Sequence, residues 1–326
     1  MKRKMPRALL TKAKANKRDE FYTQLIDIES ELKHYESHFA EKVVYCNCDD
    51  PRSSNFFRYF SSNFSRLRLK KVIAACYKCQ EGDLFAPNVN GPAIYLESES
   101  GDISPDLVER NLKPFKGDGD FRSSESISLL MQSDVVVTNP PFSLFREYVA
   151  QLIRHNKKFL IIGNINAITY KEIFGLIKEN RAWLGINLGR GVSGFIVPEH
   201  YELYGTEAEI DASGNRIISP NNCLWLTNLD TFKRHEDIPL TKRYLGNESN
   251  YPKYDNYDAI NVDKTQDIPM DYDGFMGVPI TFLHKFNPEQ FELIRFRKGH
   301  DDNDLSINGK CPYFRIIVRN RKPVPL

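Results

Sequence analysis

Apolar segments and amphipathic segments alternate between residues 25 and 188, and this alternation constrains the fold more than any other feature of the sequence. In the apolar segments consecutive residues are hydrophobic rather than every second one, which is typical of strands buried on both faces. The segments between them carry apolar residues at steps of three and four, as amphipathic helices do. The sequence therefore predicts an α/β fold in which helices cover both faces of a parallel sheet.

Strands are expected at 43–46, 70–77, 133–138, 159–163 and 183–188. Helices are expected at 25–39, 56–64, 123–131, 143–155 and 169–180, the fourth of them capped by Ser143. Residues 81–114 are rich in Gly, Pro, Ser and acidic side chains and are expected to be an excursion between strands. Past residue 189 we expect short strands at 223–229 and 278–282, a hairpin at 208–219, and a last helix beginning at Asn287-Pro288.

A chain of 326 residues can bury a full core, and this length indicates one large domain and one smaller region. We expect a basic N-terminal arm at 1–18, the sheet-forming domain at 19–189 and the smaller region at 190–326. No apolar run approaches the roughly 20 residues that span a bilayer, and the basic N-terminus lacks the apolar stretch of a secretory signal. We therefore expect a cytoplasmic protein without membrane contact.

The six cysteines are too few and too scattered for a disulfide framework, so reduced thiols are expected. Cys46-x-Cys48 and Cys76-x-x-Cys79 each end an apolar segment, and four thiolates would meet there if the two strands were neighbours. Structural zinc sites use longer and more regular spacings than this pair. We expect no metal site.

Positive charge is unevenly placed along the chain, although the net charge is only +2. Eight basic residues precede the first acidic one: Lys2, Arg3, Lys4, Arg7, Lys12, Lys14, Lys17 and Arg18. Such an arm suits a phosphate backbone, and a solvated tail has the same composition. A second, weaker candidate group lies near the C-terminus: Lys310, Arg315, Arg319, Arg321 and Lys322.

Asn139-Pro140-Pro141-Phe142 directly follows the apolar residues 135–137, where a strand is expected to end. Proline fixes its own backbone torsion and restricts the residue before it, so the Asn139 amide and the Pro140 carbonyl are held in one geometry. Two acceptors that converge on one amino group free its lone pair for methylation, and Phe142 can stack on a flat base. The alternative is a simple turn, because Asn-Pro dipeptides often begin turns.

Open parallel sheets bind ligands at the carboxyl ends of their strands, and acidic residues gather at those ends in this sequence. Asp49 and Asp50 follow the first strand, and Asp120 lies in the segment 117–121 before the third helix. These carboxylates suit the hydroxyl and amino groups of a nucleoside cofactor. Alternatively, they cap local turns.

Together these residues resemble the S-adenosylmethionine-dependent adenine-N6 DNA methyltransferases, and among them the EcoRI-type modification methylases, over essentially the whole chain. Residues 19–24 look like the N-terminal cofactor motif, Asp120-Phe121 like the acid and aromatic residue at the cofactor adenine, and residues 139–142 like the catalytic signature. Their order is similar to the gamma arrangement. An asparagine in the first catalytic position favours adenine over cytosine.

The resemblance implies a Rossmann-like catalytic domain at 19–189 and a target-recognition region at 190–326. It further implies that Tyr22 and Thr23 touch the methionine end of S-adenosylmethionine, that Asp120 binds the adenine amino group, and that Phe121 helps to hold the adenine ring. The catalytic residues would be Asn139, Pro140, Pro141 and Phe142.

Two departures from the family pattern concern the cofactor site. The usual glycine-rich turn after the first strand is replaced by Cys46-Asn47-Cys48-Asp49-Asp50-Pro51, and the second strand ends in Ala75-Cys76-Tyr77 without the expected ribose-binding acid. Asp49 or Asp50 is therefore the expected substitute.

Residues 189–194 fit a dinucleotide-binding fingerprint by spacing, but a strand-like segment follows where a helix should begin. We interpret them as a loop, from which Arg190 can approach nucleic acid.

The predicted function is methylation of an adenine that rotates out of double-stranded DNA, by a monomer that needs no metal. The EcoRI-type resemblance suggests GAATTC as the site, its inner adenine as the target, and protection from a restriction endonuclease as the purpose. Two alternatives stay open: methylation of an RNA adenine or a protein glutamine, and a non-catalytic DNA-binding protein on a methylase scaffold.

Overall fold

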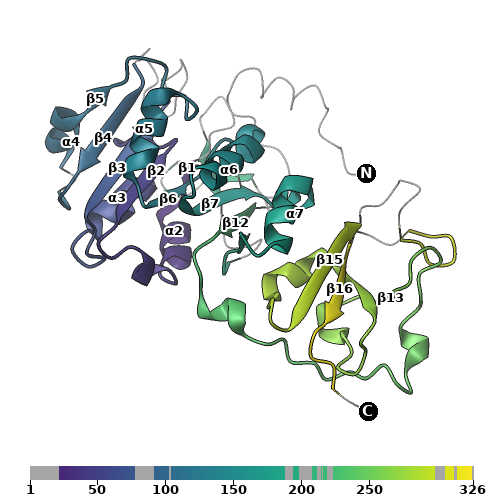
Figure 1. Cartoon of the computed structure of the whole chain (residues 1–326). Helices are drawn as coiled ribbons and strands as arrows, with labels where there is room; N and C mark the ends of the chain where they lie inside the picture. Colours follow the sequence, from purple (N-terminus) through teal and green to yellow (C-terminus); the bar gives the residue numbers. More distant parts are fainter. Residues whose placement is uncertain are drawn as a thin grey trace. The chain divides into compact units, whose positions relative to one another are not determined.

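The computed structural model describes residues 22–77, 92–102, 104–187, 194–197, 208–210, 214, 216–218, 223–297, 305–311 and 314–324. The chain forms two compact units, the first Met1–Ala167 with Gly185–Leu229 and the second Ile168–Leu184 with Asp230–Leu326 (Figure 1). The basic arm at 1–18, Cys79 and Arg190 lie outside the described residues. No helix among the described residues is long and apolar enough to cross a membrane.

The expected parallel sheet forms the centre of the first unit. Its four parallel strands lie side by side in the order β3-β2-β6-β7, with bounds Lys71–Cys76, Val43–Asn47, Val135–Thr138 and Lys158–Asn164. Every residue of β2 and β6 is buried, which explains why both strands are apolar up to their last residues, Asn47 and Thr138.

Antiparallel strands extend both edges of this parallel core. β4 (Ile94–Ser98) pairs with β3 and β5 (Lys113–Pro114) with β4, and α4 (Pro105–Asn111) lies between them in the sequence. The stretch that was expected to be an excursion therefore supplies two strands and a helix. At the other edge β12 (Cys223–Thr227) pairs with β7, although it lies beyond residue 189, so the linear boundary does not coincide with the limit of the sheet.

Four helices of the first unit lie close to their expected positions: α2 (Leu25–Leu32), α3 (Asn55–Ser62), α5 (Ser124–Gln132) and α6 (Phe145–Arg154). The first is shorter than expected and is followed by a 3-10 turn, η1 (Glu36–His38). Ser143 is not the N-cap of α6, so that expectation is wrong. It lies inside a 3-10 turn, η2 (Phe142–Leu144), which continues into the helix, and Leu144 takes the cap position.

The expected strand at 183–188 is limited to β8 (Trp183–Leu184). The buried carboxyl group of Glu31 on α2 accepts hydrogen bonds from the backbone nitrogens of Ile186 at 2.7 Å and Asn187 at 2.9 Å. Backbone groups that bond a side chain cannot continue a strand ladder, so β8 ends there.

A small antiparallel sheet brings the N-terminal motif into the first unit. Its order is β1-β9-β11-β10, with bounds Tyr22–Thr23, Phe195–Val197, Arg216–Ile218 and Ala208–Ile210. The pairing of β10 with β11 confirms the predicted hairpin. Thr23 pairs with Phe195, so residues far apart in the sequence become neighbours.

The second unit is built on a four-stranded sheet in the order β13-β14-β16-β15, with bounds Ile260–Asn261, Phe275–Pro279, Arg315–Asn320 and Phe291–Arg297. Helix α7 (Lys171–Lys178) packs on β15, where Phe174 lies 5.7 Å from Phe296 between ring centroids. Short 3-10 turns complete the described connections: η3 (Ile165–Thr169), η4 (Phe232–His235), η5 (Glu248–Asn250), η6 (Thr265–Asp267) and η7 (Ile280–Lys285).

The last helix expected at Asn287-Pro288 is absent, because the side chains that suggested a helix cap bind another segment. Asn287 Nδ2 donates to the backbone oxygen of His235 at 3.1 Å, and Gln290 forms hydrogen bonds with both the backbone nitrogen and the backbone oxygen of Ile238. The chain then continues directly as β15.

The C-terminal basic residues are used largely within this unit. Arg315 is buried, and its guanidinium donates to Asn261 at 3.1 Å and to Asp263 at 3.2 Å. Arg319 pairs with Glu292 at 2.6 Å. These contacts weaken the case for the C-terminal group as a phosphate-binding surface.

Candidate active site

The carboxyl ends of β2, β3 and β6 meet at one edge of the sheet because the three strands are parallel neighbours. Asn139 and Pro140 directly follow β6, and Asp49 follows β2. The last residue of β6, Thr138, is fully buried, and its hydroxyl group contacts both the backbone oxygen of Asn47 and the carboxyl group of Asp49. The structure thus brings the asparagine-proline motif close to Asp49, which follows β2.

The asparagine-proline motif is partly buried. Pro140 is buried, whereas Asn139, Pro141 and Phe142 are each partly exposed. The Phe142 ring lies edge-on to Phe195, with 6.2 Å between ring centroids. Since Phe195 pairs with Thr23 in the small sheet, the asparagine-proline motif lies close to the N-terminal motif.

Asp49 uses both of its carboxyl oxygens within the protein. Oδ1 lies 2.8 Å from the hydroxyl oxygen of Ser54, and Oδ2 lies 2.8 Å from that of Thr138. Desolvation raises the pKa of Asp49 to about 7, although the two hydroxyl groups and their hydrogen bonds act in the opposite direction. Asp49 therefore joins β2, β6 and the start of α3.

Asp50 shapes the turn between β2 and α3. Its carboxyl oxygen accepts a hydrogen bond from the backbone nitrogen of Arg52 at 2.8 Å, and its backbone oxygen accepts from Ser53 and Ser54. Ser54 then caps α3 by accepting from the backbone nitrogen of Phe57 at 3.1 Å. The capping interpretation is correct for this residue, which leaves a direct cofactor contact by Asp50 as a proposal.

The N-terminal motif forms β1 beside the start of α3. The backbone oxygen of Thr23 accepts a hydrogen bond from Asn55 Nδ2 at 2.9 Å. Its side chain is buried, and Thr23 Oγ1 has no hydrogen-bond partner within the part of the chain that the structure describes. Buried hydroxyl groups are normally paired, so this oxygen suits a partner that comes from a ligand. For Tyr22 the structure describes only the backbone position in β1.

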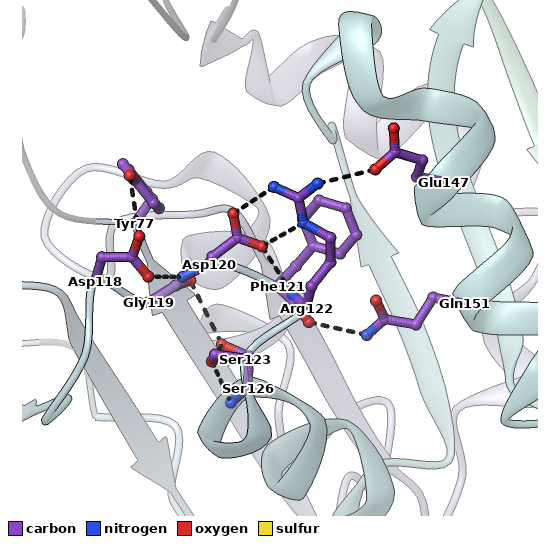
Figure 2. A network of polar contacts seen from close by, with 10 residues as sticks. All are labelled: Tyr77, Asp118, Gly119, Asp120, Phe121, Arg122, Ser123, Ser126, Glu147 and Gln151. Carbon is purple, nitrogen blue, oxygen red and sulfur yellow. Dashed lines mark hydrogen bonds and ion pairs between the residues drawn. The ribbon is translucent and has the colours of Figure 1, made fainter.

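Asp120 belongs to a network of charged groups before α5, which Figure 2 shows as a row with Arg122 and Glu147. Arg122 donates from Nε to Asp120 Oδ1 at 2.8 Å and from Nη2 to Oδ2 at 2.7 Å. Its third nitrogen, Nη1, donates to Glu147 on α6 at 2.9 Å. The hydrogen bonds to Asp120 raise the pKa of Arg122, so its guanidinium keeps its positive charge.

Phe121 packs the loop at 117–121 against α6. The side chain is buried, its centroid lies 5.0 Å from that of Tyr148, and its backbone oxygen accepts from Gln151 Nε2 at 2.9 Å. The phenol of Tyr148 in turn lies beside Asn47 and Asp49, and burial raises its pKa well above the ordinary value. Tyr148 therefore lies between the loop that carries Asp120 and the turn that carries Asp49.

A glycine sets the approach of this loop to β3. Gly119 has a φ of +74°, and a side-chain carbon there would lie 2.8 Å from the backbone oxygen of Cys76. Only glycine tolerates both conditions without strain. Tyr77, which follows β3, donates from its hydroxyl group to Asp118 at 3.2 Å (Figure 2).

Sequence reasoning missed three residues of this region. Ser54 had a detectable signal, since a serine directly before a helix is a typical N-cap. Thr138 and Arg122 had weaker ones, because a strand-end threonine and an arginine two residues after an acid have many ordinary explanations. Among the described residues no group of three or more His, Cys, Asp or Glu side chains is arranged to hold a metal ion.

Comparison with known proteins assigns the family. The model of the family described as adenine-specific methyltransferase EcoRI matches residues 9–321. The type II methyltransferase M.EcoRI of Escherichia coli is 67% identical over 326 residues, which cover 99% of both chains. M.MgeORF184P of Mycoplasma genitalium and M.MpnI of Mycoplasma pneumoniae, also type II methyltransferases, are each 37% identical, over 95% and 96% of this chain and 98% of their own. No solved structure matches the chain. The mostly parallel central sheet agrees with these matches, and the chain belongs to the EcoRI family of adenine-specific methyltransferases.

Proposed function

We propose that this enzyme transfers a methyl group from S-adenosylmethionine to the N6 amino group of an adenine in double-stranded DNA. The observation that carries the proposal is the place of Asn139 and Pro140, directly after the central strand β6 at the carboxyl edge of the sheet. An amide oxygen and a backbone oxygen held by consecutive prolines can accept both protons of one planar amino group.

Different residues of the motif would contact different parts of the target base. The Asn139 side-chain oxygen and the Pro140 backbone oxygen orient the amino group, and the partly exposed Phe142 ring offers a stacking surface. A paired adenine cannot reach this edge, so the base must leave the duplex, at a cost of a few kcal/mol that contacts with the DNA backbone offset. When bound, S-adenosylmethionine supplies an electrophilic methyl group.

Residues at the same edge fit the methyl donor. We assign Tyr22 and Thr23 to its methionine end, because the buried Thr23 hydroxyl group lacks a partner within the described residues. Asp120 and Phe121 are assigned to its adenine. Of the two acids after β2, Asp49 has both oxygens engaged by hydroxyl groups, which favours Asp50 as the direct ligand.

The proposed target is the inner adenine of GAATTC, in a cell that carries an endonuclease for the same site. The 67% identity to the type II methyltransferase M.EcoRI supports this choice. We further propose that the enzyme acts as a monomer in the cytoplasm. Its catalytic region would be 19–189, and residues 190–326 would read the bases with help from Arg190 and the basic arm at 1–18.

Two plasmids that differ at one base of a single GAATTC site test the proposal. With labelled S-adenosylmethionine, we expect label only in the intact site, at the inner adenine on sequencing, and resistance of that plasmid to the matching endonuclease. Asn139→Ala should bind the same DNA without transferring label. Equal labelling of both plasmids, or label in RNA or protein instead, would contradict the proposal.

A further inference from the structure

Thr138 has one hydroxyl proton and two oxygen neighbours that both require one. Its Oγ1 contacts the backbone oxygen of Asn47 and lies 2.8 Å from Oδ2 of Asp49. A backbone oxygen cannot donate, so the Thr138 proton must go to Asn47. The contact with Asp49 then needs a second proton, because an ionised carboxylate would place two lone pairs face to face at hydrogen-bond distance.

The other oxygen of Asp49 leaves one place for that proton. Ser54 Oγ accepts from the backbone nitrogen of Phe57 at 3.1 Å, so its own proton is available for Asp49 Oδ1 at 2.8 Å. Oδ1 is then an acceptor, and Oδ2 is the oxygen that carries the acid proton. The four contacts are satisfied together only when Asp49 is neutral.

The surroundings of Asp49 agree with a neutral acid. The titratable groups that face it are Asp50 in the same turn, Cys46 on β2 and Tyr148 on α6. Burial raises the pKa of Cys46 and of Tyr148 well above their ordinary values, so both are uncharged near neutral pH. The negative charge of Asp50 would repel an ionised Asp49 and so also favours its neutral form. The nearby cation, Arg52, lies 3.7 Å from Asp50 in an ion pair.

We propose that Asp49 is a protonated positioning residue: it donates to Thr138, and Thr138 donates to the Asn47 backbone oxygen. This relay joins the ends of β2 and β6 one residue before Asn139, and so fixes the asparagine that holds the target amino group. Ionisation of Asp49 would turn the Thr138 proton towards the carboxylate and release Asn47. The effect on methyl transfer rests on the function proposed above, whereas the protonation state of Asp49 does not.

A carbon-13 NMR titration of protein labelled at the aspartate carboxyl groups tests the protonation state without DNA or cofactor. The Asp49 signal is identified by its absence from Asp49→Asn. We expect this signal to titrate near pH 7, whereas ordinary aspartates titrate at about pH 4. A signal that titrates at about pH 5 or below would overturn the proposal, whatever the enzyme methylates.

Single-turnover methyl transfer then tests the positioning role, as the ratio of the rates above and below pH 7 for each protein. Asp49→Asn imitates the neutral acid, because its amide nitrogen can donate to Thr138 and its oxygen can accept from Ser54. Wild-type enzyme should lose about fivefold in rate above pH 7 relative to this variant, the factor that corresponds to one net hydrogen bond.

Matched variants separate this relay from general damage. Asp50→Asn should keep the wild-type pH dependence, as should Thr138→Ser, which retains the hydroxyl group. Thr138→Val should be slower and should lose the transition near pH 7. The positioning role is wrong if Asp49→Asn keeps the wild-type transition, or if Thr138→Val does.

Discussion

Two aspartates at one edge of the sheet have opposite surroundings. Asp49 is enclosed between strand ends, meets hydroxyl groups, and has a pKa raised to about 7 by desolvation. Asp120 meets the guanidinium of Arg122 in a two-pronged ion pair, whose cation is nearly half exposed, at 46%. Desolvation thus favours the neutral form of Asp49, whereas the Asp120 carboxyl group is paired with a cation.

The difference assigns them different tasks. A neutral acid inside a hydroxyl network holds backbone ends in place, and its contacts are lost if it ionises. A carboxylate paired with an exposed arginine keeps lone pairs for a further donor, because each oxygen can accept more than one hydrogen bond. We therefore expect the Asp49 side of the edge to govern the rate of transfer and the Asp120 side to govern cofactor affinity.

The largest effect is expected from Asn139→Ala, on the Asp49 side. Loss of the acceptor should slow methyl transfer on the order of a hundredfold or more, as loss of one preorganised polar group does in other enzymes. Cofactor affinity, measured by calorimetry, should stay within a few-fold. The isosteric Asn139→Asp keeps an acceptor oxygen and should retain part of the rate. If Asn139→Ala instead weakens the cofactor and leaves the rate intact, the division of tasks fails.

The next largest effect concerns stability and pH. The unfolded chain releases the Asp49 proton near pH 4, and the folded protein releases it at about pH 7. Between these values the folded state binds the extra proton, so the Asp49 contribution is fully present below about pH 4 and is lost as pH rises through 7. It amounts to roughly 4 kcal/mol in the free energy of unfolding.

Urea unfolding at several pH values measures this contribution as a difference between proteins. The free energy of unfolding of wild-type protein minus that of Asp49→Asn should fall steadily between pH 4 and pH 7 and then level off. The difference between wild type and Asp50→Asn should lack that slope. A flat curve for Asp49→Asn would mean that folding does not raise the pKa of Asp49, and the contrast between Asp49 and Asp120 would be lost.

A smaller effect is expected from Asp120→Ala. Its removal should weaken S-adenosylmethionine about tenfold, the cost of one hydrogen bond to a charged group. The maximal rate with saturating cofactor should change little, so KM should rise while kcat stays. A fall in kcat with unchanged affinity would place Asp120 on the side of the edge that controls the chemistry.

The parallel core of the fold was predictable from the sequence because burial on both faces leaves a continuous apolar record. β2, β3, β6 and β7 all lie where such runs were found, and the hairpin of β10 and β11 is also confirmed. The antiparallel strands β4 and β5 have no such record, since both are short and partly polar. The cap pattern at Asn287 misled because the same side chains bond equally well to a distant segment.

The site was predictable only where chemistry is carried by neighbours in the sequence. Asn139 and Pro140 are adjacent, so their joint geometry follows from proline sterics. The partnership of Asp49 with Thr138 joins residues 89 positions apart, and no local pattern announces it. Asp49 was one of two expected substitutes for the missing cofactor-binding residues, and the structure adds a contact with Thr138 that joins the ends of β2 and β6.

The smallest effect is expected from Glu147→Gln, which removes the outer partner of Arg122 and leaves Asp120 in place. Arg122 and Glu147 are 46% and 58% exposed, so water screens their attraction. The free energy of unfolding should fall by less than about 1 kcal/mol, and the loss should shrink further at high salt. Cofactor affinity should hardly change, because Arg122 still grips Asp120 with two nitrogens. If Glu147→Gln weakened cofactor binding as much as Asp120→Ala does, Asp120, Arg122 and Glu147 would act as one unit. Asp120 would then not be the residue of this network that governs cofactor affinity.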